Sequence, residues 1–191
     1  MRPFEQMWAY SQNIVGAFDE REARALYNKC IELPTKSVVV EIGSYLGKSS
    51  SLLAQICDDY SFYLTCVDPF LETDVSEFKK NMDGVGAKYT LMTYPEFWTH
   101  GRAPWQARFE GTRQAGKAFK KEIDLLFIDG DHHKAGVELD LEVWGSKVKK
   151  GGTIVFHDYL SSWTGVKEAV DENPTLTGGE VYGTLAVKYK I

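Results

Sequence analysis

The sequence has few cysteines, no long apolar run and no excess of basic residues. Cys30, Cys57 and Cys66 are an odd number without CxxC spacing, which supports neither a disulfide framework nor a zinc site. We therefore expect buried free thiols in a reducing compartment. No stretch approaches the ~20 apolar residues of a membrane span, and the N-terminus lacks the pattern of a signal peptide. We expect a cytoplasmic protein without a membrane partner.

The charge balance is slightly acidic. Asp and Glu number 27 against 22 Lys and Arg, which gives a formal net charge of -5. Because general nucleic-acid binding depends on neutralising phosphates, this balance argues against a nucleic-acid partner. A chain of 191 residues can bury a core of its own, and it contains no linker or internal repeat. We expect a single domain over residues 1–191 that begins with a helical segment at 1–35.

The hydrophobic pattern alternates between helices and buried strands. Helices are expected at 19–33, 49–57, 75–82, 114–121, from about 134 to a stop at 149–152, and at 166–172; strands are expected at 37–42, 62–67, 106–110, 123–128, 153–156, 180–182 and 185–189. Alternating strands and helices form a parallel sheet with right-handed crossovers. Gly183-Thr184 suits a type II′ turn between the last two strands. The fold class is therefore α/β, closed by an antiparallel hairpin.

Each expected parallel strand ends at a carboxylate. These residues are Glu41, Asp68, Glu110, Asp129 and Asp158. Ligands of open α/β sheets bind beyond the carboxyl ends of the strands. Acids gathered there repel one another unless cations or hydrogen-bond donors approach them. We therefore expect the functional site at this edge of the sheet.

The segment Gly43–Gly47 joins the first strand to a helix. Glycines there allow a tight turn and a close approach of the backbone to a ligand, beside the free N–H groups of the helix. Gly47-Lys48-Ser49 partly matches the phosphate-binding GxxxxGK[ST] loop, but Ile42 stands where that loop needs its first glycine, so an NTPase is not favoured. Asp68 lies where nucleotide-binding folds carry the acid that binds ribose hydroxyls. Loop and acid together indicate an adenosine-containing ligand held without a phosphate site.

Acidic and histidine side chains also follow two later strands. They occur in Asp129-Gly130-Asp131-His132 and in His157-Asp158. If these strand ends are neighbours, Asp129, Asp131, His157 and Asp158 converge as mixed oxygen and nitrogen ligands for Mg²⁺, Mn²⁺ or a similar ion. The alternative is that Asp129 and Asp158 only cap the following helices. The gathering of these residues at one sheet edge favours a functional site.

Four segments of the chain resemble the motifs of a known family: Val40–Ser50, Cys66–Pro69, Ile123–His132 and Gly151–Tyr159. They resemble class I S-adenosylmethionine-dependent methyltransferases, and more narrowly the metal-dependent sugar and macrolide O-methyltransferases. The resemblance covers about residues 20–191 and is poor over 71–105. It implies a Rossmann-like three-layer sandwich with a seven-stranded, mostly parallel sheet in the order 3-2-1-4-5-7-6 and an antiparallel C-terminal strand.

The resemblance also implies roles for single residues. The implied cofactor-binding residues are Glu41, Gly43, Ser44, Gly47, Asp68, Glu110, Gly111, Thr112 and Asp129. The implied metal ligands are Asp129, His157 and Asp158, and the implied catalytic residues are Asp131, as general base, and His132. The family carries two successive acids where this chain has His157-Asp158. Because neutral imidazole weakens a hard-oxygen site for Mg²⁺, the histidine favours a softer ion or none.

The stretch 79–121 combines nine Lys or Arg residues with seven aromatic residues. We expect residues 71–105 to form a substrate lid for a small-molecule acceptor, either anionic or sugar-like. The alternative is a loop that its aromatic side chains anchor. Two other functions stay open: a nucleotide-sugar glycosyltransferase with a metal on Asp129-Gly130-Asp131, and a non-catalytic adenosine-ligand binding protein. The sequence is also compatible with a homo-oligomer.

Overall fold

A seven-stranded sheet is the centre of the computed structural model, which describes residues 1–71, 73–93 and 104–191. Its strands are β1 (Val38–Ile42), β2 (Tyr63–Val67), β3 (Thr90–Met92), β4 (Ile123–Ile128), β5 (Val148–Phe156), β6 (Leu176–Tyr182) and β7 (Leu185–Lys190). Their order is β3-β2-β1-β4-β5-β7-β6, which confirms the order that the resemblance implied. Strands β1 to β5 pair in parallel, and β7 pairs antiparallel with β5 and β6.

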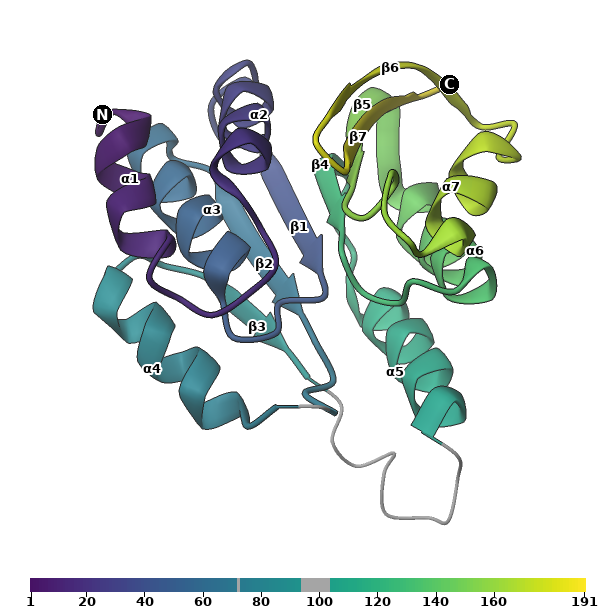
Figure 1. The fold of residues 1–191 in the computed structure, drawn as a ribbon, viewed down its shortest axis with the longest axis horizontal. Coiled ribbons are helices and arrows are strands. Elements are labelled where there is room, and N and C mark those ends of the chain that lie inside the picture. The colour runs from purple at the N-terminus through teal and green to yellow at the C-terminus, as the bar shows by residue number, and fades with distance from the viewer. Residues whose placement is uncertain (72, 94–103) are drawn as a thin grey trace.

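Helices cover both faces of this sheet. They are α1 (Phe4–Ser11), α2 (Glu20–Ile31), α3 (Lys48–Tyr60), α4 (Val75–Val85), α5 (Pro104–Ala118), α6 (Lys134–Val143) and α7 (Thr164–Asp171), with a short 3₁₀ helix, η2 (Gly145–Lys147). Helices α1 to α4 lie on one side and α5 to α7 on the other (Figure 1). Val39 packs in the first core and Val40 in the second, because successive strand side chains point to opposite faces. The chain is therefore a three-layer sandwich.

The expected third strand at 106–110 is wrong. Those residues lie in α5, and the third strand is Thr90–Met92. A strand of three residues at the edge of a sheet is too short for a clear apolar pattern. Glu110 consequently lies inside a helix and does not end a strand.

The helix after β4 is shorter than the sequence predicted. Helix α6 ends at Val143, and β5 already begins at Val148, which pairs with Ile123. Residues 149–152 therefore belong to a strand, with a register shift against β4 and a φ of 77° at Gly151. Glycine in a strand often marks such an irregularity. The basic and glycine residues that were expected to stop a helix instead form the irregular start of β5.

Two local predictions are confirmed. Gly183 has a φ of 64° in the turn between β6 and β7, which matches a type II′ turn with glycine first. The three cysteines are buried free thiols. Within the described ranges, no helix combines the length and apolarity that crossing a membrane requires.

Helix α2 begins with a reciprocal capping arrangement. The Asp19 carboxylate accepts a hydrogen bond from the backbone N–H of Glu22 at 2.9 Å, and the Glu22 carboxylate accepts one from the N–H of Asp19 at 3.2 Å. These two bonds satisfy N–H groups that have no partner within the helix. The Asp19 side chain therefore fixes where α2 starts, and its backbone N–H helps to orient the side chain of Glu22.

We expect Asp19→Ala to lower the free energy of unfolding by about 1 kcal/mol, because the N–H of Glu22 loses its acceptor. Urea denaturation of the purified variant measures this change. Asp19→Asn keeps an oxygen that can accept the bond and should remain close to the original stability. Equal stability of the Ala and original proteins would show that the cap contributes nothing.

Candidate functional site

A cavity of about 640 Å³ opens at the carboxyl ends of the parallel strands. Its wall contains residues at and after the ends of β1, β2, β4 and β5, together with residues 15–18 between α1 and α2 and residues of α3, α5 and α6. This volume lies within the usual range for small-molecule sites. The cavity is therefore where the sequence predicted the functional site.

Gly43 brings the loop after β1 against the loop after β4. Its φ is 87°, and a Cβ at this position would lie 2.0 Å from the backbone oxygen of Asp129. Its N–H also donates to the carbonyl of Val67 at the end of β2. A residue with a side chain would push these strand ends apart. Gly43 is therefore required for the shape of the cavity wall.

Glu41 lies below that loop and is fully buried. Three serine hydroxyls donate to its carboxylate, from Ser44 at 2.8 Å, from Ser49 at 2.6 Å and from Ser50. Burial raises the pKa of Glu41 to about 7, and the three hydroxyl donors act in the opposite direction. Glu41 is absent from the described wall of the cavity, whereas Ser44 and Ser49 belong to it. Its observed contacts tie the loop to α3.

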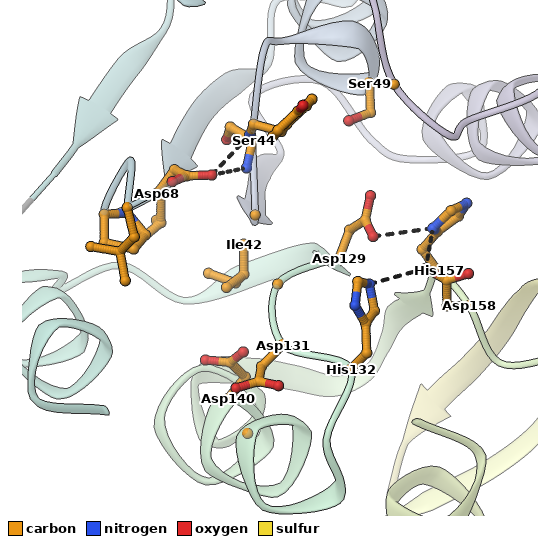
Figure 2. Close-up of a pocket in the computed structure, with 18 of the residues that line it drawn as sticks. Ile42, Ser44, Ser49, Asp68, Asp129, Asp131, His132, Asp140, His157 and Asp158 are labelled. Atoms are coloured by element: carbon orange, nitrogen blue, oxygen red, sulfur yellow. Dashed lines mark hydrogen bonds and ion pairs between the residues drawn. The ribbon is translucent and has the colours of Figure 1, made fainter. Parts of the chain in front are cut away.

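Asp68 also holds the loop after β1. One carboxylate oxygen accepts from the N–H groups of Ser44 and Tyr45, both at 2.8 Å, and the other accepts from the N–H of Phe70 at 2.6 Å (Figure 2). Asp68 lies on the cavity wall, where the predicted contact with ribose hydroxyls would occur. That contact stays a prediction, and the structure adds a role in shaping the loop.

Three side chains at the ends of β4 and β5 could hold a metal ion. Asp129, His132 and Asp158 each offer one ligand atom, and these atoms lie within 4.8 Å of one another. The Nε2 atom of His132 is 3.0 Å from Asp158 Oδ2. A hydrogen bond from His132 and the charge of His157 lower the pKa of Asp158, although burial acts to raise it. Two carboxylates and an imidazole are a reasonable donor set for a divalent ion.

His157 stands in the place of a second acid and contacts two members of this donor set. Its Nδ1 lies 3.1 Å from Asp129 Oδ1 and 3.1 Å from Asp158 Oδ2 (Figure 2). Its Nε2 lies 3.2 Å from Glu22 Oε2. Carboxylate oxygens only accept hydrogen bonds, so each ring nitrogen needs a proton. Burial opposes the charge, yet the three carboxylates raise the pKa of His157. A doubly protonated ring has no lone pair for a metal, so we replace His157 by His132 in the expected ligand set.

The two expected catalytic residues have different surroundings. His132 belongs to the possible metal site, and its ring stacks on Trp163 with centroids 5.3 Å apart. Asp131 lies on the α6 side of the cavity, where Gly136 leaves room for its carboxylate (Figure 2). One oxygen of Asp131 accepts from the N–H of His133 at 2.9 Å. Asp131 therefore lines the cavity without belonging to the metal group found among the described residues.

Several of the residues expected to bind a cofactor are not among the described lining residues of the cavity. Thr112 lines the cavity, but Glu110 and Gly111 are not among its described lining residues. Glu110 instead accepts a hydrogen bond from Gln114 within α5. Gly47 is the N-cap of α3, and a Cβ there would face Phe78, away from the described cavity wall. The expectation that Glu110 ends a strand beside the ligand is wrong because α5 occupies that part of the chain.

Sequence reasoning missed Asp140, Lys48 and the segment 15–18 as parts of the cavity wall. Asp140 accepts a hydrogen bond from Thr112 Oγ1 at 2.8 Å, and Thr112 accepts one from the Trp144 indole at 2.9 Å. A buried acid within the apolar stripe of α6 was the available signal. The ammonium of Lys48 donates to the carbonyl of Gly16 at 3.0 Å, and no sequence signal pointed to this contact. The predicted lid, 71–105, falls partly on residues 72 and 94–103, which lie outside the described residues.

Comparisons with known proteins agree with this fold. The family model described as "Methyltransferase domain" matches residues 40–159, which contain all four strand-end loops of the cavity. Residues of this chain are also 54% identical over 37 positions to the uncharacterized protein R132 of Acanthamoeba polyphaga mimivirus, covering 19% of this chain and 17% of that protein. The chain thus spans only a small part of this curated relative.

Three solved structures share the fold at low sequence identity. The O-methyltransferase NovP is 16% identical, with a TM-score of 0.68 over 88% of this chain and 77% of NovP. Cofactor-bound Rv0187 from MTB is 15% identical, with a TM-score of 0.69 over 100% of this chain and 90% of Rv0187. The calicheamicin methyltransferase CalS11 is 13% identical, with a TM-score of 0.64 over 97% of this chain and 90% of CalS11. At these identities the comparison establishes the fold.

We expect Glu41→Gln to change how stability depends on pH. The unfolded chain loses the proton of Glu41 near pH 4.3, whereas the folded protein retains it up to about pH 7. The original protein therefore loses stability relative to the variant as pH rises from about 4 to 7. Urea denaturation at pH 5, 6, 7 and 8 measures the difference. The exposed acid Glu77, changed to Gln, is the control and should follow the original protein; parallel curves for Glu41→Gln would contradict this account.

Proposed function

The chain belongs to the family described as Methyltransferase domain, and on this premise we propose that it transfers the methyl group of S-adenosylmethionine to a hydroxyl of a small-molecule acceptor. The observation that carries this proposal is the convergence of Gly43, Ser44, Asp68 and Asp129 on one cavity. Glycine at position 43 lets the loops after β1 and β4 touch at the cavity wall, and Asp68 stands at the place of a ribose-binding acid. The residues present therefore fit the cofactor.

Different residues of the cavity wall have different roles in the proposed reaction. When bound, S-adenosylmethionine supplies a methyl group on a positively charged sulfur, open to in-line attack. Asp131 accepts the proton of the acceptor hydroxyl as general base, and its carboxylate lines the cavity as this task requires. Residues 15–18 cover one side of the cavity, so that the acceptor and the methyl group meet with little water between them.

We further propose a divalent ion held by Asp129, His132 and Asp158. The ion would lower the pKa of the acceptor hydroxyl and orient it. The close approach of these three ligand atoms supports this, and it also weakens the glycosyltransferase alternative. A D-x-D metal motif requires Asp129 and Asp131 to act together, whereas the metal group found in the described part of the chain leaves Asp131 out.

The charge of the wall indicates the class of acceptor. In the described part of the chain, five aspartates line the cavity, Asp68, Asp129, Asp131, Asp140 and Asp158, against two cations, Lys48 and the imidazolium of His157. An anionic acceptor would be repelled by this wall, whereas hydroxyl groups can donate to carboxylates. We therefore propose a neutral, sugar-like acceptor in place of an anionic one.

We expect the protein to bind S-adenosylmethionine in isothermal titration calorimetry, and Gly43→Ala to weaken this binding at least ~10-fold. The added Cβ would meet the backbone of Asp129 and displace the wall of the cavity. Gly86→Ala is the matched control, because Gly86 also has a positive φ of 70° but has no atom within 4 Å of an added Cβ. If the folded protein binds neither S-adenosylmethionine nor its demethylated product, the proposed function is wrong.

The metal proposal predicts that Mn²⁺ binds the purified protein and that Asp158→Asn weakens this binding ~10-fold or more. An amide oxygen carries no full charge and is a poorer ligand for a hard cation. Electron paramagnetic resonance of free Mn²⁺ during a titration measures the affinity. Asp58→Asn, at the exposed C-terminal end of α3, removes the same charge away from the cavity and should leave Mn²⁺ affinity unchanged. Equal affinities of the Asp158 variant and the original protein would remove the metal from the mechanism.

A further inference from the structure

We infer that Glu22 of α2 is a positioning residue for this site, because through the ring of His157 it fixes the carboxylates of Asp129 and Asp158. This inference rests on the proposed function, in which those two carboxylates hold a metal ion. Glu22 itself is 3% exposed and is not among the described lining residues of the cavity. It acts through another residue and does not touch the reacting atoms.

The Glu22 carboxylate is held in one orientation by donors from three parts of the chain. Oε1 accepts from the backbone N–H of Thr184 at 2.9 Å and from its hydroxyl at 2.6 Å. Oε2 accepts from the N–H of Asp19 at 3.2 Å and lies 3.2 Å from His157 Nε2. A buried carboxylate with four hydrogen-bonding partners has little freedom to rotate. Glu22 therefore offers His157 an acceptor at a fixed point.

The opposite side of the His157 ring contacts the two acids of the site. Nδ1 lies between Asp129 Oδ1 and Asp158 Oδ2, at 3.1 Å from each. The ring of Phe18 meets the imidazole edge-on at a centroid distance of 5.8 Å. With Nε2 directed at Glu22, the ring can place Nδ1 in only one direction. The position of both carboxylate oxygens follows from that direction.

The carboxylates need such a partner because they repel one another. Asp129 and Asp158 each contribute an atom to the same group, within 4.8 Å of each other and of His132. Asp158 has in addition a φ of 57°, which non-glycine residues rarely adopt. Residues held in such conformations need support from their surroundings. The chain from Glu22 through His157 supplies this support from outside the cavity.

Metal sites commonly depend on residues of this kind. Hydrogen bonds to the ligands set their orientation, and loss of such a partner typically weakens metal binding ~10- to 100-fold. A merely structural role for Glu22 is the competing interpretation, since the same side chain completes the cap of α2 and contacts the hairpin turn at Thr184. The two interpretations differ in what happens to metal affinity when stability alone is lowered.

Glu22→Gln is the variant that separates them. It preserves the size of the side chain and an oxygen for the Thr184 donors, but it places an amide where the carboxylate faces His157. We expect Mn²⁺ affinity, measured by electron paramagnetic resonance, to fall ~10-fold. S-adenosylmethionine affinity, measured by calorimetry, should fall less than Mn²⁺ affinity, because the contacts of Gly43, Ser44 and Asp68 are untouched and only Asp129 of the four proposed cofactor residues contacts His157. If Glu22→Gln does not fold, Glu22→Asp retains the charge but is too short to reach His157, and should show the same loss.

Asp19→Ala is the matched control, since it removes the carboxylate that caps α2 but keeps the backbone N–H that donates to Glu22. It should lower stability and leave Mn²⁺ affinity unchanged. The inference is overturned if Glu22→Gln binds Mn²⁺ as the original protein does, or if Asp19→Ala weakens binding to the same degree. If the original protein binds S-adenosylmethionine but no Mn²⁺, the metal proposal fails by itself. A crystal structure of Glu22→Gln then decides: displaced Asp129 or Asp158 carboxylates support the positioning role, and unchanged ones overturn it.

Discussion

The arrangement of the cavity depends on one shared positive charge, the imidazolium of His157. Glu22, Asp129 and Asp158 all direct a carboxylate oxygen at this ring, which is 4% exposed. Removing carboxylates from water is unfavourable unless a cation or donors replace the solvent. Because the three acids come from α2, from the end of β4 and from the end of β5, their common partner joins these elements at the cavity. Burial acts to raise the pKa of Glu22, but its hydrogen-bond donors outweigh this effect and lower the pKa to about 2.

A second buried acid is stabilised without a cation. Glu41 receives three serine hydroxyls, and its pKa is raised because hydroxyl dipoles compensate burial less fully than a full charge does. Glu22 and Glu41 are thus both buried acids, but Glu22 is stabilised by a charged imidazole and Glu41 by hydroxyl groups. Between them, Gly43 allows the loops after β1 and β4 to touch. The methyltransferase cavity is formed where these constraints meet.

Local patterns in the sequence predicted most of the fold. The strand predicted at 37–42, the helix predicted at 19–33 and the turn at Gly183 all depend on neighbours in the chain, and each of these predictions is confirmed. The predictions that were wrong concern segments whose state depends on distant partners. Thr90–Met92 is a strand only because β2 pairs with it, and Val148 starts β5 only because Ile123 lies opposite. No local pattern contains this information.

The same division applies to the site. By itself the sequence determined which acids follow the strands β2, β4 and β5, and hence that a polar site lies at their carboxyl ends, since parallel strands bring these ends to one edge. Only the tertiary structure decided which partner each side chain has. His157 faces Glu22, 135 residues earlier in the chain, and so His132 takes its place in the possible metal site. The physical reason is that a histidine between buried carboxylates must donate from both nitrogens, and the packing of α2 against the end of β5 determines whether it lies there.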